Sequence, residues 1–225
     1  MTFPLRFHVL LLPNVPWAEF RARVIRLEEL GFEVAGVADH LVDWTNPPAP
    51  WFEAWTSLAA LAEATSRIRL TTLVTQIPLR NPAMLARQVL TLDHISGGRV
   101  ELGIGTGLTI DPSYAMGGFP NYSAKERVDR FGEYVDVVAQ MLAQEVTTFH
   151  GEHYAVDGIV MNPRPAQSPR PPIMIDGDGR AHAAARRAPR RHLEQLVVPA
   201  RCRRSARRDR RTLRSHRRLL RRHRS

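Results

Sequence analysis

Hydrophobic and polar positions along residues 1–179 follow two alternating patterns. Short, nearly continuous apolar runs are typical of strands covered on both faces, and apolar residues three or four positions apart are typical of amphipathic helices. The predicted strands lie at residues 5–12, 34–38, 68–74, 99–104 and 173–175. The predicted helices lie at 17–30, 52–65, 82–95 and 125–143, and residues 146–156 are expected to form a small hairpin around Gly151.

This order of elements predicts an α/β fold with a parallel sheet and right-handed crossovers, either doubly wound or closed as a barrel. In both architectures the residues that follow the strands gather at one rim, where the chemistry takes place. Four predicted strands are followed by polar residues or glycines. These are Asp39 and His40, Thr75 and Gln76, Gly105 to Gly107, and Asp176 to Gly179.

Three aromatic side chains near the second strand are candidates for the site, each with a plainer alternative. His40 could transfer a proton, with Asp39 biasing its protonation, or it could be a loop histidine that only hydrogen-bonds the backbone. Trp44 and Trp51 lie in a proline-rich loop. They could form the wall of a pocket for a planar ligand, or they could only pack the loop onto the sheet.

Two glycine-rich segments could approach a ligand closely. Residues 103–107 are neither a Walker loop nor a dinucleotide-binding fingerprint, but their backbone N–H groups could face anionic oxygens. Gly177, Asp178 and Gly179 follow a strand and precede an expected helix, so they could bind phosphate or form a bare turn. No Cys or His cluster has the spacing of metal ligands, so no metal site is predicted.

The charge of the chain changes sign near Arg180. The formal net charge is +10, but 18 of the 32 Lys and Arg residues, all of them Arg, lie in residues 180–225. The preceding part is mildly acidic, so a nucleic-acid partner is not expected, except through non-specific binding by the tail. This tail has no sustained apolar period and is expected to be disordered or irregularly helical.

The cysteine content and the N-terminal region favour a cytoplasmic protein. A single cysteine, Cys202, excludes an intramolecular disulfide and is typical of a reducing compartment. The apolar run near the start is too short for a membrane span and lacks a cleavage site, so no membrane association is expected.

Several segments together resemble the luciferase-like monooxygenase family, and within it the branch that uses coenzyme F-420, a deazaflavin. The resemblance implies a TIM (β/α)8-type barrel, of which residues 1–179 would supply about five of eight βα units. It also implies an oxidoreductase that transfers a hydride between coenzyme F-420, or alternatively FMN, and a small organic substrate. An inactive fragment and a polyanion-binding protein are the alternatives, and an open barrel could form a homodimer. The matching segments are residues 37–40, 70–74, 78–82, 92–107 and 171–179.

The resemblance also assigns roles to individual residues. It implies a non-proline cis peptide at Leu73-Val74 behind the cofactor ring, and it places His40 and Trp44 near the reacting centre. In the sugar-phosphate dehydrogenases of this branch a glutamate follows the Gly-Thr-Gly element, whereas Leu108 stands here. Leucine cannot transfer a proton, so chemistry on a sugar phosphate is not expected. The implied cofactor-binding residues are Asp39, Leu73, Val74, Gly105, Thr106, Gly107, Gly177, Asp178 and Gly179.

A shift of reading frame would explain the arginine-rich tail. The family continues after the glycine-rich turn with a helix and a strand that bears an Ala-Asp-x-Trp-Asn element. With suitable codons, residues 190–196 read one base later spell Ala-Asp-Thr-Trp-Asn-Ser-Trp. Residues 180–225 are therefore interpreted as the product of a frameshift.

Overall fold

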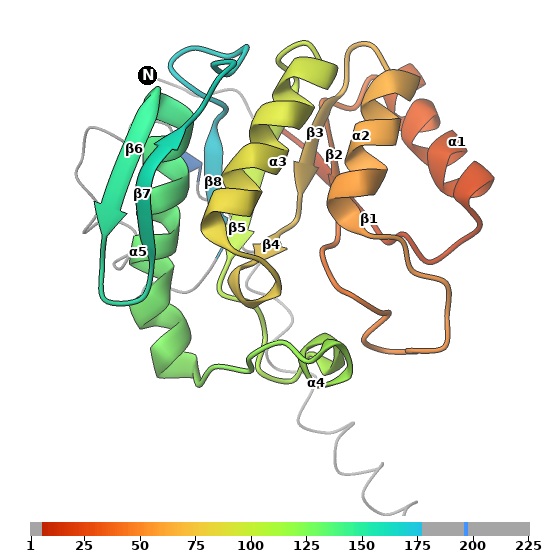
Figure 1. Ribbon diagram of the computed structural model, residues 1–225. Helices are drawn as coiled ribbons and strands as arrows, with labels where there is room; N and C mark the ends of the chain where they lie inside the picture. Colours follow the sequence, from red (N-terminus) through yellow and green to blue (C-terminus); the bar gives the residue numbers. More distant parts are fainter. Residues whose placement is uncertain (1–5, 177–195, 198–225) are drawn as a thin grey trace, which may run out of the picture.

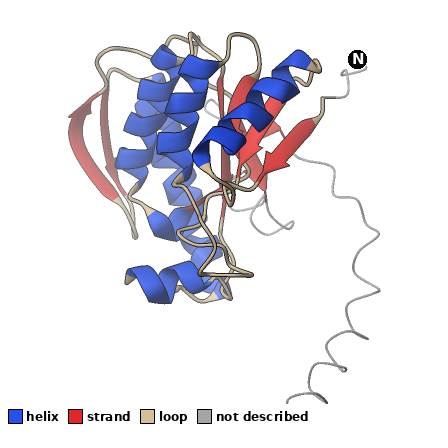
Figure 2. Cartoon of the chain, turned by 90° about the vertical axis from the view of Figure 1, so that its right-hand side faces the viewer, coloured by secondary structure: helices blue, strands red, loops and turns tan. Residues whose placement is uncertain are grey.

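The computed structural model describes residues 6–176 and 196–197, and most of them form a parallel sheet covered by helices on one face (Figures 1 and 2). Every strand pair along this sheet order is parallel. The carboxyl ends of the strands therefore share one edge of the sheet. The order is β1 (His8–Leu11), β2 (Val34–Val37), β3 (Arg69–Thr72), β5 (Val100–Gly105), β8 (Ile173–Asp176) and β9 (Leu196–Val197), with β4 (Thr75–Gln76) also pairing with β5.

Four long helices pack against the same face of the sheet. Their first turns are capped by side chains in three cases, because Glu53, Asn81 and Ser123 each accept a hydrogen bond from a backbone N–H of the helix that follows. The core between these helices and the sheet is continuous and largely aliphatic. The helices are α1 (Trp17–Glu29), α2 (Ala54–Ala64), α3 (Pro82–Ile95) and α5 (Ala124–Ala143).

The structure confirms the predicted order of elements and differs in three details. The predicted strand 68–74 ends at Thr72, and it is followed by a cis peptide at Leu73-Val74, by β4 and by the 3-10 helix η1 (Ile77–Leu79). A short helix, α4 (Pro112–Gly117), lies in a segment expected to be loop. The expected hairpin is present as β6 (Val146–His150) and β7 (Ala155–Val160), and it extends four residues further than predicted.

The tail differs from expectation at two residues. Leu196 and Val197 form β9, which pairs in parallel with Ile173 and Met174 of β8. They begin the Leu-Val-Val run of the arginine-rich region, and such residues favour strands. The remaining tail residues, 180–195 and 198–225, lie outside the described residues, so their expected disorder stays a prediction. In the part of the chain that the structure describes, no helix is long and apolar enough to cross a membrane.

Candidate active site

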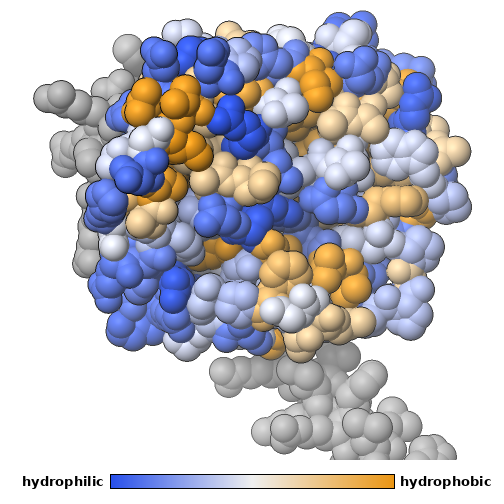
Figure 3. Space-filling view, in the orientation of Figure 1, coloured by the Kyte–Doolittle hydropathy of each residue, from blue (hydrophilic) through white to orange (hydrophobic). Residues whose placement is uncertain are grey.

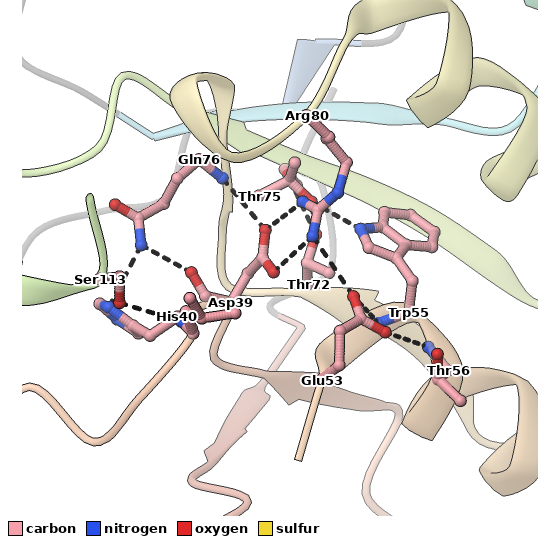
Figure 4. A network of polar contacts seen from close by, with 12 residues as sticks. Asp39, His40, Glu53, Trp55, Thr56, Thr72, Thr75, Gln76, Arg80 and Ser113 are labelled. Atoms are coloured by element: carbon pink, nitrogen blue, oxygen red, sulfur yellow. Dashed lines mark hydrogen bonds and ion pairs between the residues drawn. The ribbon is translucent and has the colours of Figure 1, made fainter. Parts of the chain in front are cut away.

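Polar side chains that follow β2 and end β4 meet at the carboxyl edge of the sheet (Figure 4), and the segment after β5 reaches the same edge. Asp39 and His40 follow β2, Gln76 ends β4, and Thr106 and Gly107 follow β5. Parallel pairing of β2 with β3, and of β4 with β5, brings these ends to the same rim. The predicted gathering is therefore present for three of the four strand ends, and residues 177–179 of the fourth lie outside the described residues.

Asp39 is held in a buried ion pair. Arg80 Nη2 donates to Asp39 Oδ1 at 2.9 Å and Arg80 Nη1 contacts Oδ2, so the guanidinium grips both oxygens. The backbone N–H of Gln76 also donates to Oδ2, at 3.3 Å. Burial alone would lower the pKa of Arg80, but the charge and hydrogen bond of Asp39 raise it. Both oxygens of Asp39 therefore already accept hydrogen bonds from the protein, which ties the end of β2 to the segment after η1.

His40 lies between two indole rings and a carboxylate. Its Nδ1 is 2.6 Å from Asp111 Oδ2. Its ring is nearly parallel to that of Trp44, with an interplanar angle of 8° and a centroid distance of 6.3 Å. Trp51 meets it edge-on and donates from Nε1 to the His40 carbonyl oxygen at 2.8 Å. The structure thus brings together His40 and Trp44, as the resemblance implied, and places Trp51 against His40 as well.

Asp111 is a fully buried carboxylate behind His40. It accepts hydrogen bonds from Ser113 N at 2.8 Å and from Gln76 Nε2 at 2.9 Å. Burial by itself would raise the pKa of Asp111, but the hydrogen bonds from Gln76, Ser113 and His40 outweigh it and lower that pKa. Gln76 Nε2 also donates to the Asp39 carbonyl oxygen at 2.6 Å. Gln76 therefore connects the loops that follow β2 and β5.

Tyr114 and Arg127 hold the side chain of Gln76 in place through hydrogen bonds. Tyr114 donates from its hydroxyl to Gln76 Oε1, and Arg127 Nη1 donates to that hydroxyl at 3.2 Å and to the Thr106 carbonyl oxygen at 2.8 Å. Burial raises the pKa of Tyr114, which favours the protonated hydroxyl that this hydrogen bond needs. Gly107, at φ 76°, packs directly against the side chains of Gln76, Tyr114 and Arg127. A Cβ at this position would lie 2.7 Å from Arg127 Nη1 and 2.8 Å from Gln76 Oε1.

The Leu73-Val74 peptide bond is cis, as the resemblance implied. The threonines on either side of it are hydrogen-bonded to each other, with 2.9 Å between the two Oγ1 atoms. Thr72 uses its proton on the Gly103 carbonyl oxygen at 2.8 Å, so Thr75 must be the donor of the pair. Trp55 Nε1 donates in turn to Thr75 Oγ1 at 3.2 Å. Leu73 and Val74 form a bulge in the backbone between β3 and β4. A series of hydrogen bonds that all run in the same direction stabilises the residues on either side of this bulge.

Glycines in the neighbouring strands leave space for the bulge. A Cβ on Gly36 would lie 2.5 Å from Leu73 Cγ, and a Cβ on Gly105 would lie 2.5 Å from Val74 Cγ2. A Cβ on Gly103 would meet the backbone of β3 as well as Val74. Alanine at any of these positions would force the bulge to move.

Several residues of the site were not predicted from the sequence, and one predicted segment cannot be placed. Gly177, Asp178 and Gly179 lie outside the described residues. The residues missed were Arg80, Asp111, Tyr114 and Arg127. Only Asp111 carried a local signal, since Asp followed by Pro is typical of a helix start, with the cap first and proline at the first helical position. Among the described residues, no group of three or more His, Cys, Asp or Glu side chains could hold a metal ion.

Comparison with known proteins agrees with this geometry. The family model described as luciferase-like monooxygenase matches residues 2–218. The F-420-dependent glucose-6-phosphate dehydrogenase of Intrasporangium calvum is 35% identical over 147 residues, which cover 64% of this chain and 43% of that protein. The F-420-dependent hydroxymycolic acid dehydrogenase of Mycobacterium tuberculosis is 32% identical over 153 residues, which cover 68% of this chain and 41% of that protein. The chain thus spans less than half the length of these relatives.

Solved structures show the same fold. A structure of an F-420-dependent secondary alcohol dehydrogenase in complex with an F-420–acetone adduct aligns with a TM-score of 0.72 at 24% identity, covering 88% of this chain and 58% of that one. The monooxygenase RslO1 from Streptomyces bottropensis aligns with a TM-score of 0.63 at 28% identity, covering 76% and 53%. Together with the match over residues 2–218, the rim and the cis peptide lead to one conclusion: the chain belongs to the luciferase-like monooxygenase family.

Proposed function

We propose that this chain supplies the cofactor-binding and catalytic part of a deazaflavin-dependent oxidoreductase, which transfers a hydride between coenzyme F-420 and a small organic substrate. The observation that carries the proposal is the position of His40, which lies at the sheet rim with Trp44 on one face and Asp111 at Nδ1. The relatives named as F-420-dependent dehydrogenases support the choice of cofactor, and FMN is the alternative.

The domain division and the extent of the barrel are part of this proposal. We propose that residues 1–179 form about five units of a TIM barrel and that residues 180–225 are a frameshifted tail. Leu11 packs against the core beneath the helices, so Leu10 faces the opposite side of β1. Leu10 is 51% exposed, although that side would be the interior of a closed barrel. This exposure supports an open barrel.

The residues at the rim fit a planar, partly polar cofactor. When bound, a deazaflavin supplies a ring carbon that accepts or donates a hydride. The bulge at Leu73 and Val74 is seated in glycine gaps and offers a rigid apolar support. The backbone of Gly105, Thr106 and Gly107 would hold polar parts of the cofactor. We propose that its phosphate is bound by Gly177, Asp178 and Gly179. Asp39 would keep the residues of the rim in position beside the cofactor.

The proton that accompanies the hydride is assigned to His40. A carbonyl and an alcohol differ by one hydride and one proton, so a residue must donate or accept that proton at the substrate oxygen. Leu108 cannot do so, and Trp44 supplies an apolar wall that is 41% exposed. His40 therefore exchanges the proton, and Trp44 orients the substrate.

An apolar rim around His40 favours an uncharged, apolar substrate. Five large apolar side chains on the two loops beside His40 are between 41% and 72% exposed. Apolar residues also group at the lower edge of the view in Figure 3, in the region of α4. Exposed apolar groups near a site are typical of ligand-binding surfaces. The five are Leu41, Trp44, Leu108, Ile110 and Met116.

Titration with the cofactor tests the proposal. Fluorescence quenching would give the Kd of coenzyme F-420 and of FMN, and loss of F-420 absorbance would give turnover with a panel of uncharged secondary alcohols and glucose 6-phosphate. His40→Ala should reduce turnover by about 10² or more and change the Kd little. His150→Ala, in an exposed residue of the hairpin, is the control. Absence of F-420 binding by the wild type would instead indicate an inactive fragment, and unchanged turnover in His40→Ala would contradict the role of His40.

A further inference from the structure

We propose that Asp111 is the positioning residue of His40: it keeps the proton of the imidazole on Nδ1, so that Nε2 is the nitrogen that exchanges a proton with the substrate. This inference rests on the proposed function and adds to it a residue that the sequence did not reveal. It also explains how the site operates with leucine at position 108.

The tautomer follows from counting donors. Gln76 Nε2 carries two hydrogens, and they are used at 2.6 Å on the Asp39 carbonyl oxygen and at 2.9 Å on Asp111 Oδ2. Its distance to His40 Nδ1 is longer, at 3.2 Å. An ionised carboxylate only accepts hydrogen bonds, so the proton in the 2.6 Å contact between His40 and Asp111 is on Nδ1. In the neutral imidazole, Nε2 consequently keeps its lone pair.

The ring can present only one nitrogen to the rim. Trp44 lies against its face and Trp51 against its edge, so the two indoles restrict rotation of the imidazole. Within the part of the chain that the structure describes, Nε2 makes no hydrogen bond, while the side chain of His40 retains 17% exposure. Nε2 is therefore the nitrogen available to a bound molecule.

A series of donors directed at Asp111 keeps its carboxylate ionised. Arg127 donates to the hydroxyl of Tyr114, Tyr114 donates to Gln76 Oε1, and Gln76 donates to Asp111 Oδ2. Each link polarises the next in the same sense. The positive charge of Arg127, itself 2% exposed, lies at the far end of the series. When Nε2 accepts a proton, the resulting imidazolium lies beside a carboxylate that is already charged and desolvated, which stabilises it.

The simpler role for Asp111 is to cap α4, because Asp111 Oδ1 accepts the N–H of Ser113. Asp111→Asn separates the two roles. Asparagine is as good an N-cap as aspartate, so its oxygen can keep the contact with Ser113. Its amide nitrogen would then face His40 Nδ1 as a donor, which requires Nδ1 to lose its proton. A capping role predicts no change at the ring, and the positioning role predicts the opposite tautomer.

Nitrogen-15 NMR of the full chain with labelled histidine would read the tautomer without cofactor or substrate. The His40 signals are identified by their absence in His40→Ala. We expect Nδ1–H in the wild type, Nε2–H in Asp111→Asn, and the wild-type pattern in Ser123→Ala, which removes the cap of α5 without contact to His40. An unchanged tautomer in Asp111→Asn would overturn the proposal.

Kinetics with coenzyme F-420 complete the test. Asp111→Asn should lower kcat by about 10²-fold to 10⁴-fold, as expected for a histidine held in the wrong tautomer, and leave the Kd of the cofactor within about threefold. A normal kcat in this variant would also overturn the positioning role. A wild type that fails to bind the cofactor would defeat the proposed function alone, because the NMR result still decides the role of Asp111.

Discussion

Two glycines of one loop offer a matched test of the hydrogen-bond group beneath the site. Gly107 and Gly118 both have left-handed backbone conformations, with φ of 76° and 69°. A Cβ on Gly118 would meet nothing within 4 Å, whereas a Cβ on Gly107 would meet Tyr114 Oη, Arg127 Nη1 and Gln76 Oε1. Alanine at the two positions therefore differs in what surrounds it and not in the backbone it must adopt.

The magnitudes follow from these surroundings. Left-handed backbone costs alanine about 1–2 kcal/mol, which is the whole expected effect of Gly118→Ala. In Gly107→Ala the buried groups must also shift, at about 1–3 kcal/mol for overpacking, and the hydrogen bond from Tyr114 to Gln76 is lost, at about 1–3 kcal/mol. We expect Gly107→Ala to lower the free energy of unfolding by about 3–8 kcal/mol, a large share of the stability of an ordinary domain.

Urea unfolding followed by tryptophan fluorescence measures both variants, because the chain has four tryptophans that report on the loop and the core. The slope of the free energy against urea should stay the same, so that the midpoints compare stability directly. If the two variants differed by less than about 0.5 kcal/mol, Tyr114 and Arg127 would have moved aside without cost. The packed group would then be too soft to hold Gln76 and Asp111 in place.

Two further predictions concern stability elsewhere in the molecule. Thr72→Val should lower the free energy of unfolding by about 1–3 kcal/mol, because it leaves the Gly103 carbonyl oxygen and the Thr75 hydroxyl without their partner. The control is Thr91→Val, at an exposed helical position, which should change that free energy by less than about 0.5 kcal/mol in the same urea experiment. Burial, with a smaller contribution from Glu133, raises the pKa of Asp136 from 3.8 to about 6, so the folded state binds a proton more tightly than the unfolded state. This contribution to stability is present below pH 4 and is lost as the pH rises to 6. The stability of Asp136→Asn relative to the wild type should therefore increase between pH 4 and 7. Parallel profiles of unfolding free energy against pH for the two proteins would contradict the raised pKa of Asp136.

The order of helices and strands was predictable because each element buries a face that its own sequence encodes. α5 shows this over 20 residues, where Phe131, Val135 and Val138 repeat at helical spacing and are buried. α4 was missed for the opposite reason: six residues are too few to display a period. The turn at Leu73-Val74 was expected only from the family resemblance, since periodicity carries no information about a peptide isomer.

The residues of the candidate site likewise divide into those that the sequence predicted and those that it did not. His40 and Gly107 were found because they follow strands, and a parallel sheet places all such residues at one rim. Arg80 and Arg127 come from segments whose approach depends on tertiary packing, so no local pattern identifies them, and the Asp-Pro signal at Asp111 indicates only a helix start. Arg127 illustrates the difficulty: it occupies a helix position that reads as one more surface charge, yet it is 2% exposed and donates to the Thr106 carbonyl oxygen.

The loop after β5 has no acid directly after Gly107, but it contains a buried acid, Asp111. Residues 106–118 contain a single carboxylate, Asp111, and the position directly after Gly107 is Leu108. The side chain of Asp111 is fully buried and in contact with Nδ1 of His40, whereas Leu108 is 50% exposed. Under the proposal that His40 transfers the proton, this loop orients that histidine through Asp111 and adds no second acid to the site. The proposed function therefore favours interconversion of an alcohol and a carbonyl, which needs one proton transfer, over chemistry that needs a separate acid and base on the substrate.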